Sequence, residues 1–341
     1  MFVYKVALSF LSSIFLIVPS TDSASVMQSK IFTIGEHGSL DVQVTGGDVR
    51  LNSWDRGEVK VDAKVLVDSR NLDITQVGEK VIVKYNTEKT TKSGEVIFDV
   101  YAPKSIDVKV KTQGGHIALQ TESWGKVTFD TFGGDIKIGD FDGDLSAKVT
   151  GGNVRGGNIK GKVKIVSAGG NIIVESVSGS LGISAMGGNV KVGDVMSSIE
   201  VSNSGGDIVI GGAAGKGNDN EHFKCVSGSV TARSSGGNLT ASLAPGSGKS
   251  TLYSAGGHVS LYLPETARTA IDTRIKIKGD WDKLKKSIGV RADFRHESYE
   301  EDKAQQVIRA NYILNGGGGS ISVETLTSAV EIRKLKSCGP F

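Results

Sequence analysis

Apolar residues recur with two superimposed periods through the middle of this chain. They alternate with polar residues over short stretches, and the whole pattern returns at every eighteenth position. Alternation with a period of two is typical of a β-strand with one buried face, whereas a helix has a period of 3.6. The repeat places equivalent apolar residues in five columns: Val127, Leu145, Val163, Leu181, Ile199; Phe129, Ala147, Ile165, Ile183, Val201; Ile136, Val154, Ile172, Val190, Ile208; Ile138, Gly156, Val174, Val192, Ile210; and Phe141, Ile159, Val177, Val195, Ala213.

Each repeat holds two short strands and a third apolar residue at a corner, so no single repeat can bury its own apolar face. Stacking equivalent residues about 4.8 Å apart joins those faces into a continuous core. The pattern therefore predicts an all-β fold, a single-chain β-solenoid with 18-residue coils. Thr128 and Ser146 fall between the apolar columns and are expected to point outward.

A Gly-Gly pair followed by a polar residue marks one turn of every coil. The polar residues are Asp48, His116, Asp135, Asn153, Asn171, Asn189, Asp207, Asn238 and His258. Glycine reaches positive φ at little cost, and Asp and Asn suit turns through local hydrogen bonds. We interpret this polar column as structural, with an amide ladder among its Asn residues. A row of ligand carboxylates is the alternative.

The regular spacing of these turns is interrupted between Asp207 and Asn238, where the interval is much wider. Residues 226–230 repeat the form of residues 177–181, so the register resumes after an insertion. The extra residues fall near 211–223, a segment rich in Gly, Ala, Asn and charge. This composition indicates an exposed loop inserted into one coil.

The pattern loosens toward both ends of the chain. We predict an N-terminal β segment and cap over residues 26–112, regular solenoid over 113–264, a C-terminal β cap over 265–335 and a tail over 336–341. The caps would cover edges that otherwise template aggregation. Residues 281–302 are highly charged, which favours a solvated loop or short helix, with a binding patch as the alternative.

The N-terminal segment, residues 1–25, has the form of a secretory signal. Lys5 precedes an uncharged, mostly apolar run over residues 6–18, and small residues follow at 23–25. This run is too short to cross about 30 Å of hydrocarbon as a helix. We therefore expect cleavage near Ser25, a secreted, periplasmic or cell-surface location, and no membrane span in the mature chain; an uncleaved anchor is the alternative.

Composition adds little about chemistry. The chain has 341 residues, 46 glycines and a net charge of +3, so no basic face dominates and no nucleic-acid partner is expected. Its two cysteines, Cys225 and Cys338, are too few for a disulfide framework. One bridge is conceivable, but because Cys338 lies in the predicted tail we favour two independent thiols.

Two motifs resemble functional sites without matching them. Residues 244–251 (APGSGKST) resemble a phosphate-binding loop, but the leading glycine is missing and the sequence that follows is strand-like, not helical. Asp140, Asp142 and Asp144 alternate in a turn but lack the rest of a calcium loop. Spacing assembles no catalytic triad, and His116 and His258 lie too many coils apart to share a metal ion. We therefore assign no catalytic, cofactor-binding or metal-binding residue and expect no cofactor.

Several segments resemble one known family. Residues 32–34 and 38–42, Gly-Gly-Asp-Val at 46–49, Trp-Asp-Arg at 54–56 and Val-Lys-Val at 59–61 are similar to the opening of the putative-adhesin family of bacterial β-solenoid proteins, relatives of the auto-transporter adhesin head domain. Residues 101–108 and 261–264 also resemble its internal repeat. The likeness covers roughly residues 31–335. It implies a β-solenoid of largely unassigned role and supplies no catalytic residues.

Three functions remain open at this point. The first is a non-enzymatic secreted or envelope-associated adhesin-like scaffold that binds an envelope protein or glycan through its solenoid surface. The second is a polysaccharide-active β-helix enzyme, for which residues 140–144 and the 211–223 loop are the only places to look. The third is a self-assembling envelope filament that stacks end to end. The export signal and repeats favour the first.

Overall fold

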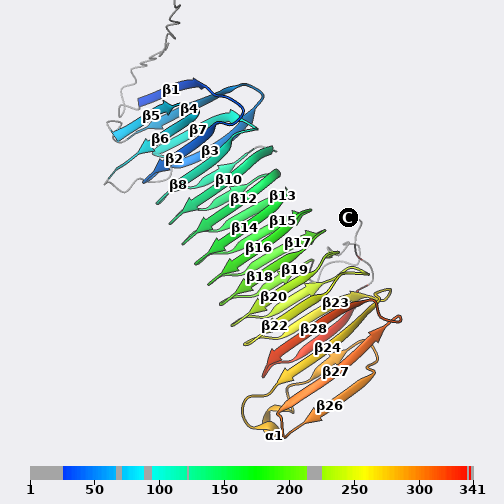
Figure 1. Cartoon of the computed structure of the whole chain (residues 1–341). Coiled ribbons are helices and arrows are strands. Elements are labelled where there is room, and N and C mark those ends of the chain that lie inside the picture. Colours follow the sequence, from blue (N-terminus) through cyan, green and yellow to red (C-terminus); the bar gives the residue numbers. More distant parts are fainter. Residues whose placement is uncertain are drawn as a thin grey trace, which may run out of the picture.

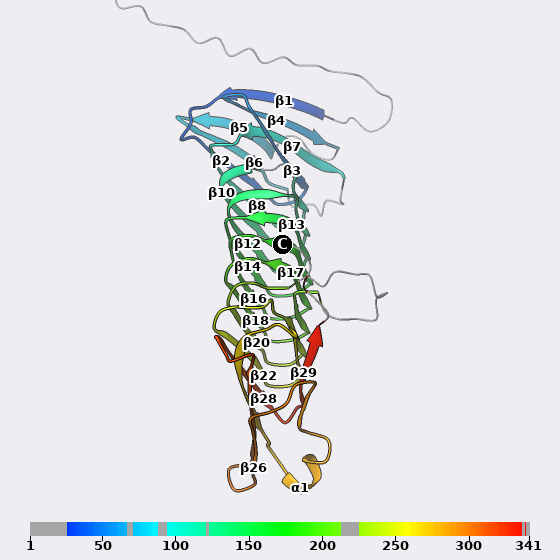
Figure 2. The same cartoon turned by 90° about the vertical axis from the view of Figure 1, so that its right-hand side faces the viewer.

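The computed structural model describes residues 26–66, 71–87, 94–120, 123–212, 225–335 and 338. The expected signal segment at 1–25, most of the loop near 211–223 and most of the tail lie outside these residues. The described chain is a long stack of β coils with two facing layers, which we name face A and face B (Figures 1 and 2). Their apolar sides meet in one core that runs the length of the stack.

Face A consists of strands that hydrogen bond in one continuous order. From the N-terminal end they are β5 (Leu72–Val77), β6 (Lys80–Tyr85), β2 (Ser39–Val44), β8 (Asp107–Thr112), β10 (Ser123–Thr131), β12 (Phe141–Val149), β14 (Lys162–Ser167), β16 (Ser180–Ala185), β18 (Ile199–Asn203), β20 (Val230–Ser234), β22 (Ser250–Ser254), β28 (Gly319–Leu326), β24 (Thr269–Lys276), β27 (Val307–Leu314) and β26 (Ser298–Asp302).

Face B has the same arrangement, and several of its strands have only three residues. In spatial order they are β1 (Val26–Thr33), β4 (Glu58–Val65), β7 (Val96–Pro103), β3 (Asp48–Trp54), β9 (Ile117–Leu119), β11 (Ile136–Ile138), β13 (Val154–Lys160), β15 (Ile172–Val177), β17 (Val190–Val195), β19 (Ile208–Ile210), β21 (Leu239–Ser242), β23 (Val259–Pro264), β29 (Val330–Leu335) and β25 (Val290–Ala292). Pairings between β12 and β13 at one corner link the two faces.

The register confirms the predicted columns. Val163 pairs with Leu181 and Ile172 pairs with Val190, each one coil apart and in parallel. The members of these columns that the structure describes are buried, while Thr128 and Ser146 lie on the outer side of face A. One position needs correction: Val226, not Ala213, follows Val195 in the corner column, because the bridge between them spans the inserted loop.

The coils are not stacked entirely in sequence order. At the N-terminal end, β2 and β3 lie between the coil of β6 and β7 and the coil of β8 and β9. At the C-terminal end, β28 and β29 lie between the coil of β22 and β23 and the coil of β24 and β25. At each end, therefore, one coil lies between two coils that are not its neighbours in sequence order on both sides.

Antiparallel strands cover both ends of the stack. Hairpin strands β5 and β6 and the pair β1 and β4 close the N-terminal end, and β26 pairs antiparallel with β27 at the other (Figure 1). The charged segment at 281–302 contains the expected short helix, α1 (Trp281–Leu284), and also β25 and β26. Trp281 is buried, so this segment is anchored to the core and is not simply a solvated loop.

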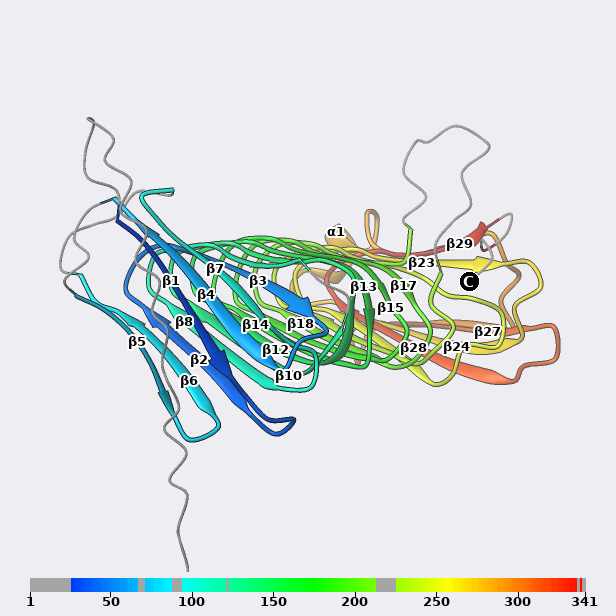
Figure 3. The same ribbon diagram turned by 90° about the horizontal axis from the view of Figure 1, so that it is seen from above.

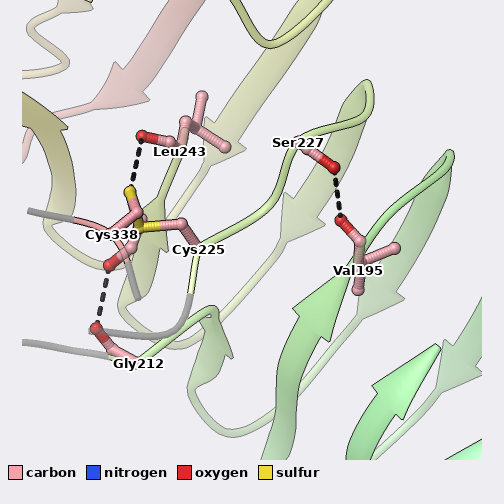
Figure 4. Close-up of a disulfide and its surroundings, with 7 residues drawn as sticks. Val195, Gly212, Cys225, Ser227, Leu243 and Cys338 are labelled. Carbon is pink, nitrogen blue, oxygen red and sulfur yellow. Dashed lines mark hydrogen bonds between the residues drawn. A yellow bond between two sulfur atoms is a disulfide. The ribbon is translucent and has the colours of Figure 1, made fainter. Parts of the chain in front are cut away.

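The two cysteines form a disulfide, which corrects the expectation of independent thiols. Their Cα atoms lie 5.6 Å apart (Figure 4). Insertion of β29 beside β23 brings Cys338 back to the coil that contains Cys225, and the Cys338 Sγ lies 3.9 Å from the carbonyl oxygen of Leu243. The two cysteines are separated by 113 residues in the sequence, so their proximity could not be predicted from it.

Removing this bridge should lower stability substantially. A cross-link that closes a loop of about 100 residues contributes roughly 4 to 5 kcal/mol in the loop-closure treatment. We expect the Cys225→Ser/Cys338→Ser double variant to unfold at clearly lower temperature than the parent, measured by circular dichroism. Alkylation of the unreduced, unfolded parent should label neither cysteine. Two labelled thiols, or an unchanged melting temperature, would contradict the assignment.

Candidate binding surface

The polar column after the Gly-Gly pairs is a continuous hydrogen-bond ladder. Each side chain accepts a hydrogen bond from the backbone N–H of the equivalent residue one coil on, as from Asn171 to the Oδ1 of Asn153 at 2.9 Å and from Asn189 to the Oδ1 of Asn171 at 2.8 Å. His116 and His258 accept through Nδ1. The ladder runs from Asp48 to Ala329. Because these acceptors are used between coils, the column is structural, as the sequence indicated.

One substitution in the ladder tests this role. Asn171→Ala removes the acceptor for the Asn189 N–H, and we expect a loss of about 1 kcal/mol in the free energy of unfolding. Asn171→Asp keeps a side-chain oxygen at that position and should retain most of the stability. Urea denaturation of the two variants measures the difference. Equal destabilisation by Ala and Asp would show that the oxygen is not what matters.

Face A presents regular rows of outward side chains, because parallel strands in register contribute one residue each to a row. A central row reads Lys109, Thr128, Ser146, Lys164, Gly182 and Glu200. A second row crosses most of the molecule and reads Lys111, Asp130, Lys148, Val166, Ser184, Ser202, Arg233, Tyr253, Glu324, Arg274, Arg309 and Glu300. Figure 3 shows the stacked strands from above.

Charged side chains of opposite sign adjoin on some neighbouring strands of face A, whereas Arg274 and Arg309 are neighbours of like sign. Lys111, Asp130 and Lys148 are successive members of one row. Near the N-terminal end, burial raises the pKa of Asp41, but hydrogen bonds from Lys80 and Gln43 and the charge of Lys109 outweigh it, so the net pKa lies below the ordinary value. The Lys80 Nζ is 2.9 Å from the Asp41 carboxylate. Face A is therefore a regular, polar surface that carries charges of both signs.

Two shallow grooves lie toward the C-terminal end of face A. The first, of about 320 Å³, is lined by Lys249, Ala270, Asp272, Asn311, Ile313 and Ser322 among others. The second, of about 510 Å³, is lined by Gly246–Lys249, Arg268 and Gly317–Ser320. The grooves share Lys249 and Ser320. The segment that resembles a phosphate-binding loop thus lies in a turn at the second groove, and strand β22 follows it.

The three aspartates of residues 140–144 do not form one carboxylate cluster. Asp140 accepts hydrogen bonds from the backbone and side-chain amides of Asn158 at 2.9 and 3.0 Å, while Asp142 and Asp144 lie on strand β12. Among the described residues, no group of three or more potential metal ligands is gathered. Of the tryptophans, Trp54 stacks near Tyr101, with ring centroids 5.5 Å apart.

A family model described as Toastrack DUF4097 matches residues 37–285, more than two thirds of the chain. The chain belongs to the Toastrack DUF4097 family. This confirms the resemblance to a family of adhesin-like β-solenoids without an assigned function.

Solved structures similar to this Toastrack chain carry several descriptions. A putative adhesin from Bacteroides fragilis is 11% identical, covers 93% of this chain and 99% of its own, and has a TM-score of 0.35. A putative adhesin from Parabacteroides distasonis is 14% identical over 71% and 92% of the two chains, with a TM-score of 0.33. A putative lipid binding protein from the same species is 10% identical over 91% and 97%, with a TM-score of 0.34. No curated protein matches the chain.

Sequence reasoning missed the second groove of the Toastrack chain. The groove is lined by three segments, near residues 246–249, 268 and 317–320, which are far apart in sequence. They meet only because β28 inserts between β22 and β24. The glycine-rich segments at 246–248 and 316–319 could have indicated two tight turns, but nothing in their spacing predicts that the two turns lie side by side. Within the described part of the chain, no helix has the length and apolar content needed to span a bilayer.

Proposed function

We propose that this protein is a non-enzymatic, secreted or envelope-associated adhesin-like scaffold that binds a protein or glycan of the cell envelope on face A. The observation that carries the proposal is the register of the outward rows. Stacked coils hold these side chains at fixed spacing on a surface that needs no reorganisation before binding. The resemblance to adhesin-like β-solenoids and the expected export signal are consistent with the same function.

Face A is a better binding surface than face B. Its central strands all have five to nine residues, whereas face B mixes three-residue strands (β9, β11 and β19) with strands of six or seven residues (β13, β15 and β17). Longer strands expose more side chains per coil, and face A also carries both grooves. Ile173 is the outward residue of β15 on face B, and a change there leaves face A untouched.

Binding to purified envelope fractions tests the proposal. We expect saturable binding of the wild-type protein, lost when Ser146→Arg and Ser184→Arg together obstruct face A. The matched face B variant, Ile173→Arg, should bind like the parent. Failure of the wild-type protein to bind envelope fractions or intact cells would contradict the proposal. Release of reducing ends from a polysaccharide panel would favour the enzyme instead.

The strands at the C-terminal end of the stack argue against the filament. Strand β26 has the sequence SYEED and presents an exposed, acidic edge, and β25 has only three residues. Charged or very short edge strands are how β proteins avoid edge-to-edge pairing. We therefore infer a monomeric solenoid. Sedimentation velocity over a wide range of protein concentration should show a single species, and growth of the species with concentration would restore the filament.

A further inference from the structure

Three turns converge around the second groove. They are residues 246–249 before β22, residues 265–268 before β24 and residues 316–319 before and at the start of β28. The Gly319 N–H donates to the Arg268 carbonyl at 3.1 Å, which fixes two of the turns together. A Cβ atom added to Gly319 would lie 2.6 Å from the Ser247 carbonyl oxygen, so the third turn packs equally closely.

The groove is positively charged. Lys249 and Arg268 are its only charged lining residues, and both are exposed. Neither forms an ion pair within the described residues, although the nearby Glu265 does so with Lys334 at 3.1 Å. The two cations are therefore available to a ligand, and no carboxylate lines the groove to oppose an anion.

The groove also contains hydrogen-bond donors without acceptors. The backbone N–H groups of Gly246, Gly248 and Gly318 donate to no acceptor in the part of the chain that the structure describes. Ser247 also lines the groove; its hydroxyl has no hydrogen-bond partner among the described residues, and its oxygen is accessible from the groove. A ligand oxygen at this position could replace water as the partner of the hydroxyl and of these amides.

We propose that this groove is a binding site for a phosphate group. Glycine N–H groups in tight turns and flanking cations are the usual donors to tetrahedral oxyanions, and such charge-assisted hydrogen bonds are among the stronger ones in proteins. Phosphate has enough oxygens to accept from the Ser247 hydroxyl, several amides and two cations together. The groove lies at the C-terminal end of face A, but this proposal does not depend on envelope binding by the outward rows, because it concerns a local site with its own ligand.

Titration of the purified protein with inorganic phosphate, followed by NMR at constant ionic strength, tests the site. We expect saturable shifts of the Gly246, Gly248 and Gly318 amide signals. Lys249→Met/Arg268→Met should weaken the affinity about tenfold or more. Lys164→Met removes an exposed lysine of face A and should leave the affinity unchanged. Ser247→Ala should weaken phosphate binding without lowering the melting temperature, since no internal hydrogen bond is lost.

Three results would overturn the proposal: no saturable shift across the millimolar range, equal affinity in the double variant, or equal loss in Lys164→Met. Vesicles distinguish the sources of the phosphate. Sedimentation with phosphatidylglycerol but not phosphatidylcholine vesicles, lost in the double variant, would identify a lipid headgroup. Binding of inorganic phosphate without binding to either vesicle would identify a soluble or polymer-borne phosphate.

Discussion

Replacing Ile172 with aspartate will prevent the solenoid from folding. Ile172 is fully buried on β15 between Val154 and Val190 of the adjacent coils. The aspartate would place a carboxylate in the apolar column with no cation beside it, and burying an unpaired charge costs more than a typical domain can lose, roughly 5 kcal/mol or more. We expect the variant to lack the cooperative thermal transition of the parent in circular dichroism.

The next residue is a matched control. Ile173 has the same side chain on the same strand but points outward and is 37% exposed. Ile173→Asp should therefore change the free energy of unfolding by less than about 1 kcal/mol. If Ile172→Asp melts like the parent, or if both variants fail equally, the inward and outward assignments of β15 are wrong.

Gly188→Ala has the second large expected effect. Gly188 is the second glycine of its pair, has φ of +72°, and faces the carbonyl oxygen of Gly170 in the coil before it. A Cβ atom would approach that oxygen to less than 3.0 Å, so the two coils would have to separate locally. Left-handed backbone strain alone costs about 1 to 2 kcal/mol, and we expect a total loss of roughly 3 kcal/mol or more.

The first glycine of the same pair provides the comparison. A Cβ atom on Gly187 would lie 3.6 Å from the Ala168 carbonyl oxygen, an ordinary contact. Gly187→Ala should change stability by no more than about 0.5 kcal/mol. Urea unfolding curves of the two variants measure the difference in their free energies of unfolding. Similar losses would mean that turn flexibility, not close stacking, explains the Gly-Gly pair.

Most of the solenoid was predictable because its determinants are local. The constant repeat length sets which residues stack, so pairs such as Val163 and Leu181 follow from the sequence alone. The resumption of the register at Val226 also follows from a local likeness. The position of the polar ladder was predictable, but its hydrogen bonds were not. Its side chains accept from the backbone N–H of the next coil and do not mainly bond to one another.

The disulfide and the second groove were not predictable, because their determinants are not local. Both depend on β28 and β29 lying inside the stack and not at its end. A periodic pattern specifies neighbours one repeat apart, but it carries no information about a segment that returns across several elements. Cys338 and Gly319 are therefore adjacent to residues of much earlier coils without any signal in their spacing.

The position of β28 and β29 has a consequence for how the molecule is completed. Strands β28 and β29 occupy a slot between two pairs of strands that are specified earlier in the sequence. Until β28 and β29 pair, the strands on either side of that slot lack their native hydrogen-bonding partner, so this part of the stack cannot be completed in sequence order.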